Sequence, residues 1–152
     1  LGRGTFRDPK ALVASGEFLF VLDYGNRQVQ RLSLDGRYLS RYAFRRSRES
    51  EELRLLGGVG VEGERLYLYD TEAAKVRELD LSGALLASYP LPLLEGEDRM
   101  SLVELLPFRG VLYAARRGSS RVHRVDLGTG KPLPPLEVYA PVRALALWRN
   151  PS

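Results

Sequence analysis

The chain has 152 residues, of which 44% are hydrophobic, and it carries a formal net charge of +4. This length and composition are typical of one globular domain with a substantial core. No apolar run approaches the roughly 18 residues of a transmembrane helix, so we expect no membrane insertion in this segment, and the absence of cysteine excludes disulfides, thiolate catalysis and cysteine metal sites.

Four short strands are predicted at the start of the chain, at residues 10–14, 18–22, 28–34 and 37–42. Polar and apolar side chains alternate along them with a period of two, and corners that contain glycine separate them. We therefore expect one four-stranded antiparallel sheet. After it, residues 47–56 have a composition that is also compatible with one or two helical turns.

The same pattern then recurs. A shift of 47 residues superposes equivalent positions, among them Gly16 on Gly63, Asp23 on Asp70, Val29 on Val76, Leu32 on Leu79 and Gly36 on Gly83. A shift of 46 places Tyr67 on Tyr113, Val76 on Val122 and Asp80 on Asp126, and a fourth copy begins at Pro141–Trp148. Self-similarity at a period of ~40 to 50 residues is typical of solenoids, propellers and arrays.

Four strands in every 46 or 47 residues is the spacing of propeller blades. We therefore predict an all-β fold, in which residues 1–152 form a single propeller segment of three four-stranded antiparallel blades plus the first strand of a fourth. The blades are expected at about residues 5–45, 53–91 and 100–140, and the fourth blade is expected to start at about 141–149.

Propellers close with about 4 to 8 blades, so this segment is expected to lack part of the ring. The remaining blades would come from a longer parent chain or from a second copy. The start on Leu1 instead of Met and the interrupted fourth unit favour a parent chain. The compartment of the protein is not predicted.

The first unit resembles an NHL repeat. The matching positions are Phe6, Pro9, Gly16, Asp23, Asn26, Val29, Asp35 and Gly36. The second unit keeps Asp70 and Val76 but has Ala73 in place of the Asn, and the third has Arg116 in place of the Asp. The resemblance implies a six-bladed propeller of NHL type, in which we expect the Asp-x-x-Asn corner to tie a loop to backbone groups.

The sequence shows no dense group of residues of the types that carry out catalysis or bind metal ions. His123 is the only histidine, and we expect it to be half-exposed on a strand, since Ser119, Ser120 and Asp126 lie too close along that strand to form a triad with it. The acidic run at residues 93–100 is expected to be a solvated connection. We predict no catalytic residue, no metal site and no cofactor.

The glycine-rich stretch LGGVGVEG at residues 56–63 leads from one strand to the next. A phosphate loop requires a helix N-terminus after the glycines. We therefore expect no nucleotide site there.

Two sets of loops are expected on opposite faces of the disc. Because the strands of a blade are antiparallel, the corners between second and third strands emerge together with the links between blades. We call this the link face, and the opposite one the hairpin face. The predicted partner-binding residues of the link face are Tyr24, Asn26, Arg27, Arg45, Arg46, Arg48, Arg116, Arg117 and Arg121. Rigid scaffolds usually carry function on loops, although charged residues are often only hydrated.

The sequence thus predicts a non-enzymatic binding or scaffold module that docks a protein partner. A phosphorylated or acidic surface is a plausible target, because arginine binds such groups with two hydrogen bonds. An RNA-binding propeller is an alternative, and it requires stacking aromatics beside the basic loops, for which Tyr24 is available. A metal-dependent lactonase or hydrolase-type propeller is another, and its metal ligands would come from blades outside this segment.

Overall fold

The computed structural model of the chain describes residues 5–43, 56–138 and 142–146. In these residues, twelve strands form three four-stranded antiparallel sheets, each in chain order. Blade 1 contains β1 (Pro9–Ser15), β2 (Phe18–Asp23), β3 (Gln28–Ser33) and β4 (Tyr38–Tyr42). Blade 2 contains β5 (Leu56–Glu62), β6 (Arg65–Asp70), β7 (Lys75–Asp80) and β8 (Leu85–Pro90). Blade 3 contains β9 (Val103–Phe108), β10 (Val111–Arg116), β11 (Arg121–Asp126) and β12 (Pro132–Glu137).

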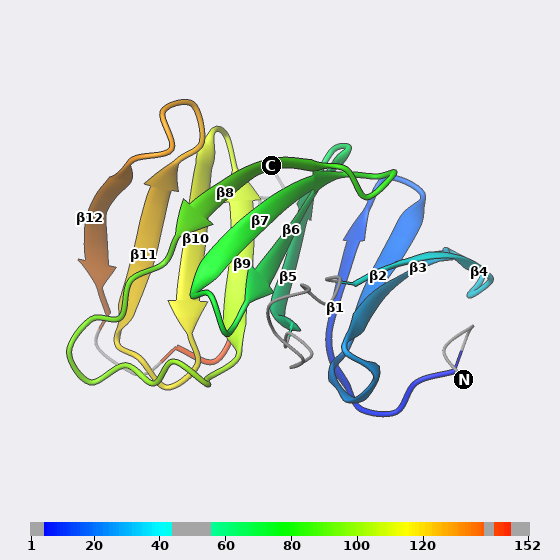
Figure 1. The fold of residues 1–152 in the computed structure, drawn as a ribbon, viewed down its shortest axis with the longest axis horizontal. Helices are drawn as coiled ribbons and strands as arrows, with labels where there is room; N and C mark the ends of the chain where they lie inside the picture. Colours follow the sequence, from blue (N-terminus) through cyan, green and yellow to red (C-terminus); the bar gives the residue numbers. More distant parts are fainter. Residues whose placement is uncertain (1–4, 44–55, 139–141, 147–152) are drawn as a thin grey trace, which may run out of the picture.

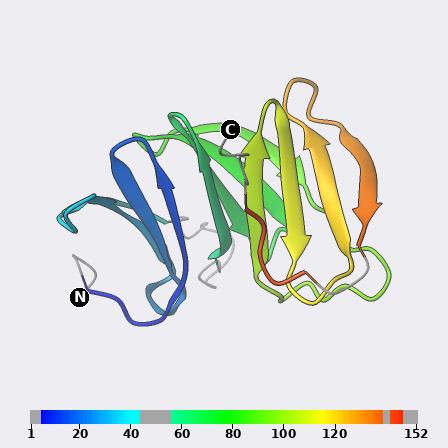
Figure 2. The ribbon, with the colours of Figure 1, turned by 180° about the vertical axis from the view of Figure 1, so that it is seen from behind.

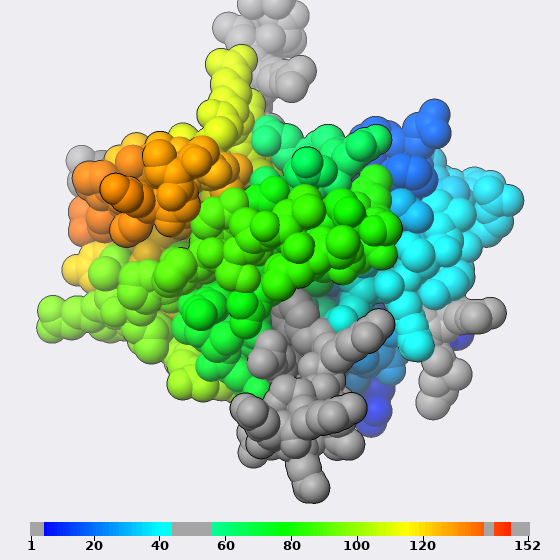
Figure 3. Space-filling view, turned by 45° about the horizontal axis from the view of Figure 1, so that its top comes forward, coloured from blue at the N-terminus to red at the C-terminus, as the bar shows by residue number. Residues whose placement is uncertain are grey.

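The all-β fold with three four-stranded sheets is confirmed, and the sheets stand side by side (Figure 1). Contacts between blades involve mainly the first two strands of each, and β5 packs against both β1 and β9. These first strands are therefore the inner strands. In the space-filling view, blade 2 (green) lies between blade 1 (blue to cyan) and blade 3 (yellow to orange) (Figure 3).

Local sequence explains the hairpins. Gly16 and Gly36 adopt left-handed φ angles of 58° and 88°, and their counterparts Gly63 and Gly83 adopt 58° and 93°. Such angles cost glycine little, because it has no Cβ. The recurrence of these glycines at the same turns is why the sequence repeat predicts the strand positions of blade 1 to within about two residues.

Two hydrophobic cores lie between the blades, one on each side of blade 2. Alternation along β6 divides its side chains, so that Leu66 and Leu68 face blade 1 while Tyr67 and Tyr69 face blade 3. The core between blades 1 and 2 includes Phe20, Leu22, Val29, Tyr42, Leu56, Val59, Leu66, Leu68 and Leu79. The core between blades 2 and 3 includes Tyr67, Tyr69, Val76, Tyr89, Leu91, Val103, Leu105, Leu112, Ala114 and Val125. The face of blade 2 that packs against blade 1 thus carries different side chains from the face that packs against blade 3.

The glycines of β5 have a packing role. A Cβ on Gly58 would overlap the carbonyl oxygen of Val103, and a Cβ on Gly60 would lie 2.8 Å from the carbonyl oxygen of Leu105. The glycine-rich stretch therefore lets two inner strands approach closely near the axis. It lies within a strand, as part of the scaffold.

After blade 3, residues 142–146 cover its outer face (Figure 2). The N–H of Val142 donates to the carbonyl oxygen of Ser119 at 2.7 Å, and Val142 and Leu145 pack near Ala115 and Val122. These residues are not assigned to a strand, since none of the described residues pairs with them as a second strand. The fourth blade therefore stays a prediction.

The possible helical turns at residues 47–56 fall outside the described residues, except for Leu56, which begins β5. Within the described ranges, no helix is long and apolar enough to cross a membrane.

Candidate partner-binding face

The second strand of each blade ends at a buried polar residue on the link face. Asp23, Asp70 and Arg116 occupy equivalent positions at the ends of β2, β6 and β10, and all three are fully buried. Buried polar groups must be satisfied by hydrogen bonds. Each of these residues therefore organises the loops around it, and each does so differently.

In blade 1, the Asp23 carboxylate holds two segments together. It accepts hydrogen bonds from the backbone N–H groups of Arg7 (3.1 Å) and Asp8 (2.9 Å) and from the Asn26 amide (2.6 Å). Residues 24–26 form a 3-10 turn, after which Arg27 has a left-handed φ of 53°. The expected tie to backbone groups is confirmed, and the Asn26 amide is used within the protein.

In blade 2, Asp70 accepts a hydrogen bond from the backbone N–H of Ala73 at 3.2 Å and pairs with Arg77 at 3.4 Å. Ala73 stands where blade 1 has Asn26, so the side-chain amide is replaced by a backbone donor. The corner thus keeps its anchor although the Asn is missing.

In blade 3, Arg116 reverses the polarity of this position. Its guanidinium donates to the carbonyl oxygen of Pro92 (2.9 Å) and to the Tyr69 hydroxyl (3.1 Å), and it pairs with Glu97 at 3.1 Å. The side chains of Arg116 and Glu97 are both almost completely buried. The prediction that Arg116 contacts a partner is therefore wrong for this structure, because its guanidinium is buried and bonded to other groups of the protein.

Glu97 is the centre of this buried network. Besides Arg116, its carboxylate accepts hydrogen bonds from the Leu94 backbone N–H (3.0 Å), from the Ser119 hydroxyl (2.7 Å) and from His123 Nε2 (2.8 Å). Burial raises the pKa of the carboxyl, but the donors from Leu94, Ser119 and His123 outweigh it, and the pKa is lowered overall. The network fastens the link between blades 2 and 3.

Two expectations about this region need correction. His123 is not half-exposed, because it is buried and bonded to Glu97. The acidic run is exposed at Glu95 and Asp98 as expected, but the Glu97 side chain is buried. The order of the groups also does not suit nucleophilic catalysis. The carboxylate stands between Ser119 and His123, whereas a nucleophilic serine needs the imidazole next to its hydroxyl.

The sequence contains one signal that points to this network. Arg116 aligns with Asp23 and Asp70, which predicts a buried position, and a buried arginine requires an acidic partner. The identity of that partner is not predictable from the repeated strands, since Glu97 lies in the link between β8 and β9 and not in a strand.

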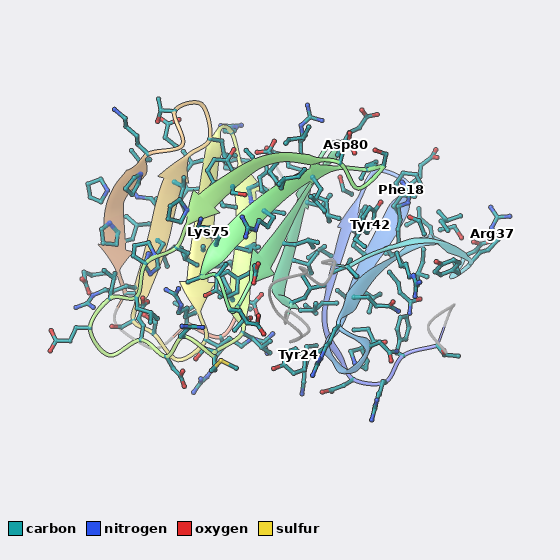
Figure 4. The ribbon with its side chains drawn as sticks, in the orientation of Figure 1. Phe18, Tyr24, Arg37, Tyr42, Lys75 and Asp80 are labelled. Carbon is teal, nitrogen blue, oxygen red and sulfur yellow. The ribbon has the colours of Figure 1, made fainter. Side chains whose placement is uncertain are left out.

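The remaining predicted residues that the structure describes lie on the link face, and they differ in exposure and in their ion pairs. Tyr24 and the corner that contains it point to the lower side in Figure 4, opposite Phe18 and Asp80. Arg27 is exposed and forms no ion pair within the described part of the chain. Arg117 pairs with Glu104 at 2.7 Å, and Arg121 pairs with Glu137 at 3.0 Å. Arg45, Arg46 and Arg48 lie outside the described residues, so their place on this face stays a prediction.

The link face has mixed charge. Arg7, Arg27 and Arg99 are exposed, and so are Glu95 and Asp98. A partner would therefore meet individual arginines instead of a uniformly positive surface.

The hairpin end of the inner strands has a cavity of about 560 Å³. Its walls are mainly apolar and come from β1, β5, β9 and Ala146, with Glu62 as the charged side chain. Among the described residues, no group of three or more His, Cys, Asp or Glu side chains could hold a metal ion.

Comparison with known proteins shows which solved structures have a similar fold. No protein-family model and no curated protein sequence matches the chain. Among solved structures, it is similar to hydrazine synthase of Kuenenia stuttgartiensis, with a TM-score of 0.63 and 15% identity over 94% of this chain and 40% of that one. It is also similar to the WD40 repeats of RRP9, with a TM-score of 0.63 and 15% identity over 90% of this chain and 41% of that one.

A third similar structure is the computationally designed Ika4 protein, with a TM-score of 0.62 and 16% identity over 93% of this chain and 81% of the designed one. At these identities the comparisons show the fold alone. The chain spans about two fifths of the hydrazine synthase and RRP9 chains. The three sheets with their anchored corners are therefore part of a β-propeller.

Proposed function

We propose that the chain is a non-enzymatic binding module, part of a propeller of NHL type, and that its link face docks an acidic or phosphorylated protein surface. The observation that supports this proposal is the anchoring of the loops. Asp23 and Asp70 bond to the corners that follow them, and Arg116 bonds to the link between blades 2 and 3, so the exposed side chains of these loops start from ordered positions. Pre-organised side chains lose less entropy when a partner binds.

Arg27 is the best-placed contact residue. It follows a 3-10 turn whose carboxylate anchor accepts from two backbone groups and one amide, and its own side chain is exposed. An arginine held in this way can present its planar guanidinium to a phosphate or carboxylate. Arg117 and Arg121 already pair with Glu104 and Glu137, so a partner would have to compete with these acids.

The assignment to the NHL type rests on the first unit. There the Asp23 and Asn26 pair makes the hydrogen bonds that the motif implies. Blades 2 and 3 keep the position but change the residues, so the proposal treats them as degenerate repeats.

The proposal is tested with a fluorescein-labelled degenerate phosphoserine peptide library and its unphosphorylated counterpart, measured by fluorescence polarisation at several salt concentrations. We expect the phosphorylated library to bind better. Joint replacement of Arg27, Arg117 and Arg121 by Ala should weaken binding and flatten its dependence on salt, since fewer charges are neutralised.

A matched control replaces Arg37, Arg65 and Arg109 by Ala on the hairpin face. Arg109 has a φ of 49°, close to the 53° of Arg27, so both triple variants change charge and local backbone strain alike. Equal affinity of the two variants would contradict the proposal. Tighter binding of a labelled single-stranded oligouridine than of the phosphopeptides would instead favour the RNA alternative.

A further inference from the structure

Arg117 joins two blades at the link face. Its Nε donates to Glu104 Oε1 at 2.8 Å, and its Nη2 lies 2.7 Å from the same oxygen and donates to the carbonyl oxygen of Lys10 at 3.3 Å. Glu104 belongs to β9 of blade 3, whereas Lys10 belongs to β1 of blade 1. The guanidinium therefore lies between the inner strands of these blades, and 35% of the Arg117 side chain is exposed.

The corner that carries Arg27 is bonded to the same stretch of blade 1. The backbone N–H of Tyr24 donates to the carbonyl oxygen of Asp8 at 3.0 Å, and Asp8 precedes Lys10 by two residues. Arg117 and the corner of Arg27 are thus both fastened to residues 8–10. One partner surface can therefore contact the two arginines.

Arg117 must give up an internal ion pair before it can bind a partner. The Glu104 side chain is only 19% exposed, so solvent screens this pair less than a fully exposed one. Exchange of Glu104 for a carboxylate of the partner replaces one single negative charge by another, so it yields almost no net attraction. A phosphomonoester carries a charge of about −1.5 to −2 at neutral pH and has three acceptor oxygens, so the same exchange is favourable for it.

Arg121 shows the contrasting case. It pairs with Glu137 at 3.0 Å, but the Glu137 side chain is 70% exposed. Ion pairs in contact with solvent contribute little, so Glu137 competes only weakly with an incoming anion of either kind. Discrimination between phosphate and carboxylate is therefore expected at Arg117 and Glu104.

We propose that Glu104 is a specificity-determining residue, which makes the link face respond to phosphorylated protein surfaces more than to surfaces that are only acidic. Glu104 cancels the attraction of Arg117 for a carboxylate, but it cancels only part of the attraction for a phosphate dianion. This inference rests on the proposed function of the link face. It narrows the partner to a phosphorylated one and assigns the selection to one internal carboxylate.

The test measures how much Arg117 contributes to the binding of each anion. Two fluorescein-labelled degenerate peptide libraries, one with a fixed phosphoserine and one with a fixed glutamate in its place, are compared by fluorescence polarisation. In the unmodified protein, Arg117→Ala should weaken binding of the phosphoserine library by roughly two- to fivefold, the range that a partly exposed ion pair supplies, and leave binding of the glutamate library unchanged. In the Glu104→Gln protein, Arg117→Ala should weaken binding of both libraries, because no internal carboxylate competes there.

Glu64→Gln is the matched control for the change of charge. Glu64 is exposed in the turn between β5 and β6, on the hairpin face, so its replacement removes the same charge from the opposite side of the protein. In the Glu64→Gln protein, binding of the glutamate library should stay insensitive to Arg117→Ala. Glu104→Ala takes the place of Glu104→Gln should that variant fail to fold, and the same result is expected from it.

Equal weakening of both libraries by Arg117→Ala in the unmodified protein would overturn the inference and leave the proposed function intact, since the arginines would still bind the partner. A phosphoserine library that does not respond to Arg117→Ala would overturn it as well. So would a glutamate library that stays insensitive to Arg117→Ala after Glu104 is replaced. Binding of neither library to the unmodified protein would instead overturn the proposed function, and the inference with it.

Discussion

Replacement of Glu97 by Gln is expected to destabilise the protein strongly. The carboxylate is almost completely buried and accepts from four donors, of which Arg116 is a cation that is itself fully buried. Gln keeps the shape but removes the compensating charge. Breaking a buried ion pair by removing one partner typically costs about 3–5 kcal/mol, because the other charge is left uncompensated. Domains are stable by only about 5–15 kcal/mol in total.

The assay is urea unfolding followed by circular dichroism, with the free energy of unfolding extrapolated to water. Glu95→Gln is the matched control, since Glu95 belongs to the same link but is exposed. Its replacement should change the free energy of unfolding by no more than about 0.5 kcal/mol. The comparison therefore separates loss of the buried charge from a general effect of changing the link.

A double-mutant cycle with Arg116→Met tests the pairing itself. Once Arg116 is gone, Glu97→Gln no longer strands a cation, so its cost should fall well below its cost in the parent protein. The reasoning is refuted if Glu97→Gln costs no more than Glu95→Gln, or if the two replacements of the pair are simply additive.

Three further predictions concern the same scaffold. The lowered pKa of Glu97 contributes stability that is fully present above its unfolded value near 4.5 and is lost as the pH falls through the folded value, so urea midpoints should drop at acid pH in the parent and less in Glu97→Gln. Gly58→Ala should cost about 1–3 kcal/mol in urea unfolding because the new Cβ meets the Val103 backbone, whereas Gly128→Ala meets only a side-chain oxygen at 3.2 Å; equal costs would contradict the close approach. Asp23→Ala should cost about 1–3 kcal/mol and speed amide hydrogen exchange at residues 7 and 8, and unchanged exchange there would exclude the anchoring role.

The fold was predictable because the repeated residues determine where the turns and strands lie. Glycines at equivalent turns set the left-handed angles, and alternation with a period of two divides each strand between two faces. Gly16 and Gly63 share a φ of 58°, and the equivalent residues Val29 and Val76 are both buried between blades. A pattern repeated at this spacing specifies strand order and pairing without any knowledge of the distant contacts.

The link face was less predictable for a physical reason. Topology places Arg116 at the link face, but whether its side chain points into solvent or into the protein depends on a partner in another segment. Glu97 lies 19 residues earlier, in the link between β8 and β9 and not in a strand. An expectation that groups arginines by loop position therefore mixes exposed Arg27 with buried Arg116.

Asp23, Asp70 and Arg116, which end the second strands of the three blades, are all buried and must all form hydrogen bonds, but each bonds to different groups. A residue buried where a second strand ends must bond to the loops that cross it, and Asp23 and Asp70 do so as acceptors of N–H groups. Arg116 can only donate, so it must find oxygens, and it uses the carbonyl groups of Leu91 and Pro92 together with Glu97. The exchange of Asp for Arg transfers the anchor from the backbone N–H groups of the corner to the link between blades. The loss of the motif in blade 3 therefore changes which loop the buried residue holds: Arg116 holds the link between blades 2 and 3 instead of the corner after its own strand. This link lies on the face on which we propose that a partner binds.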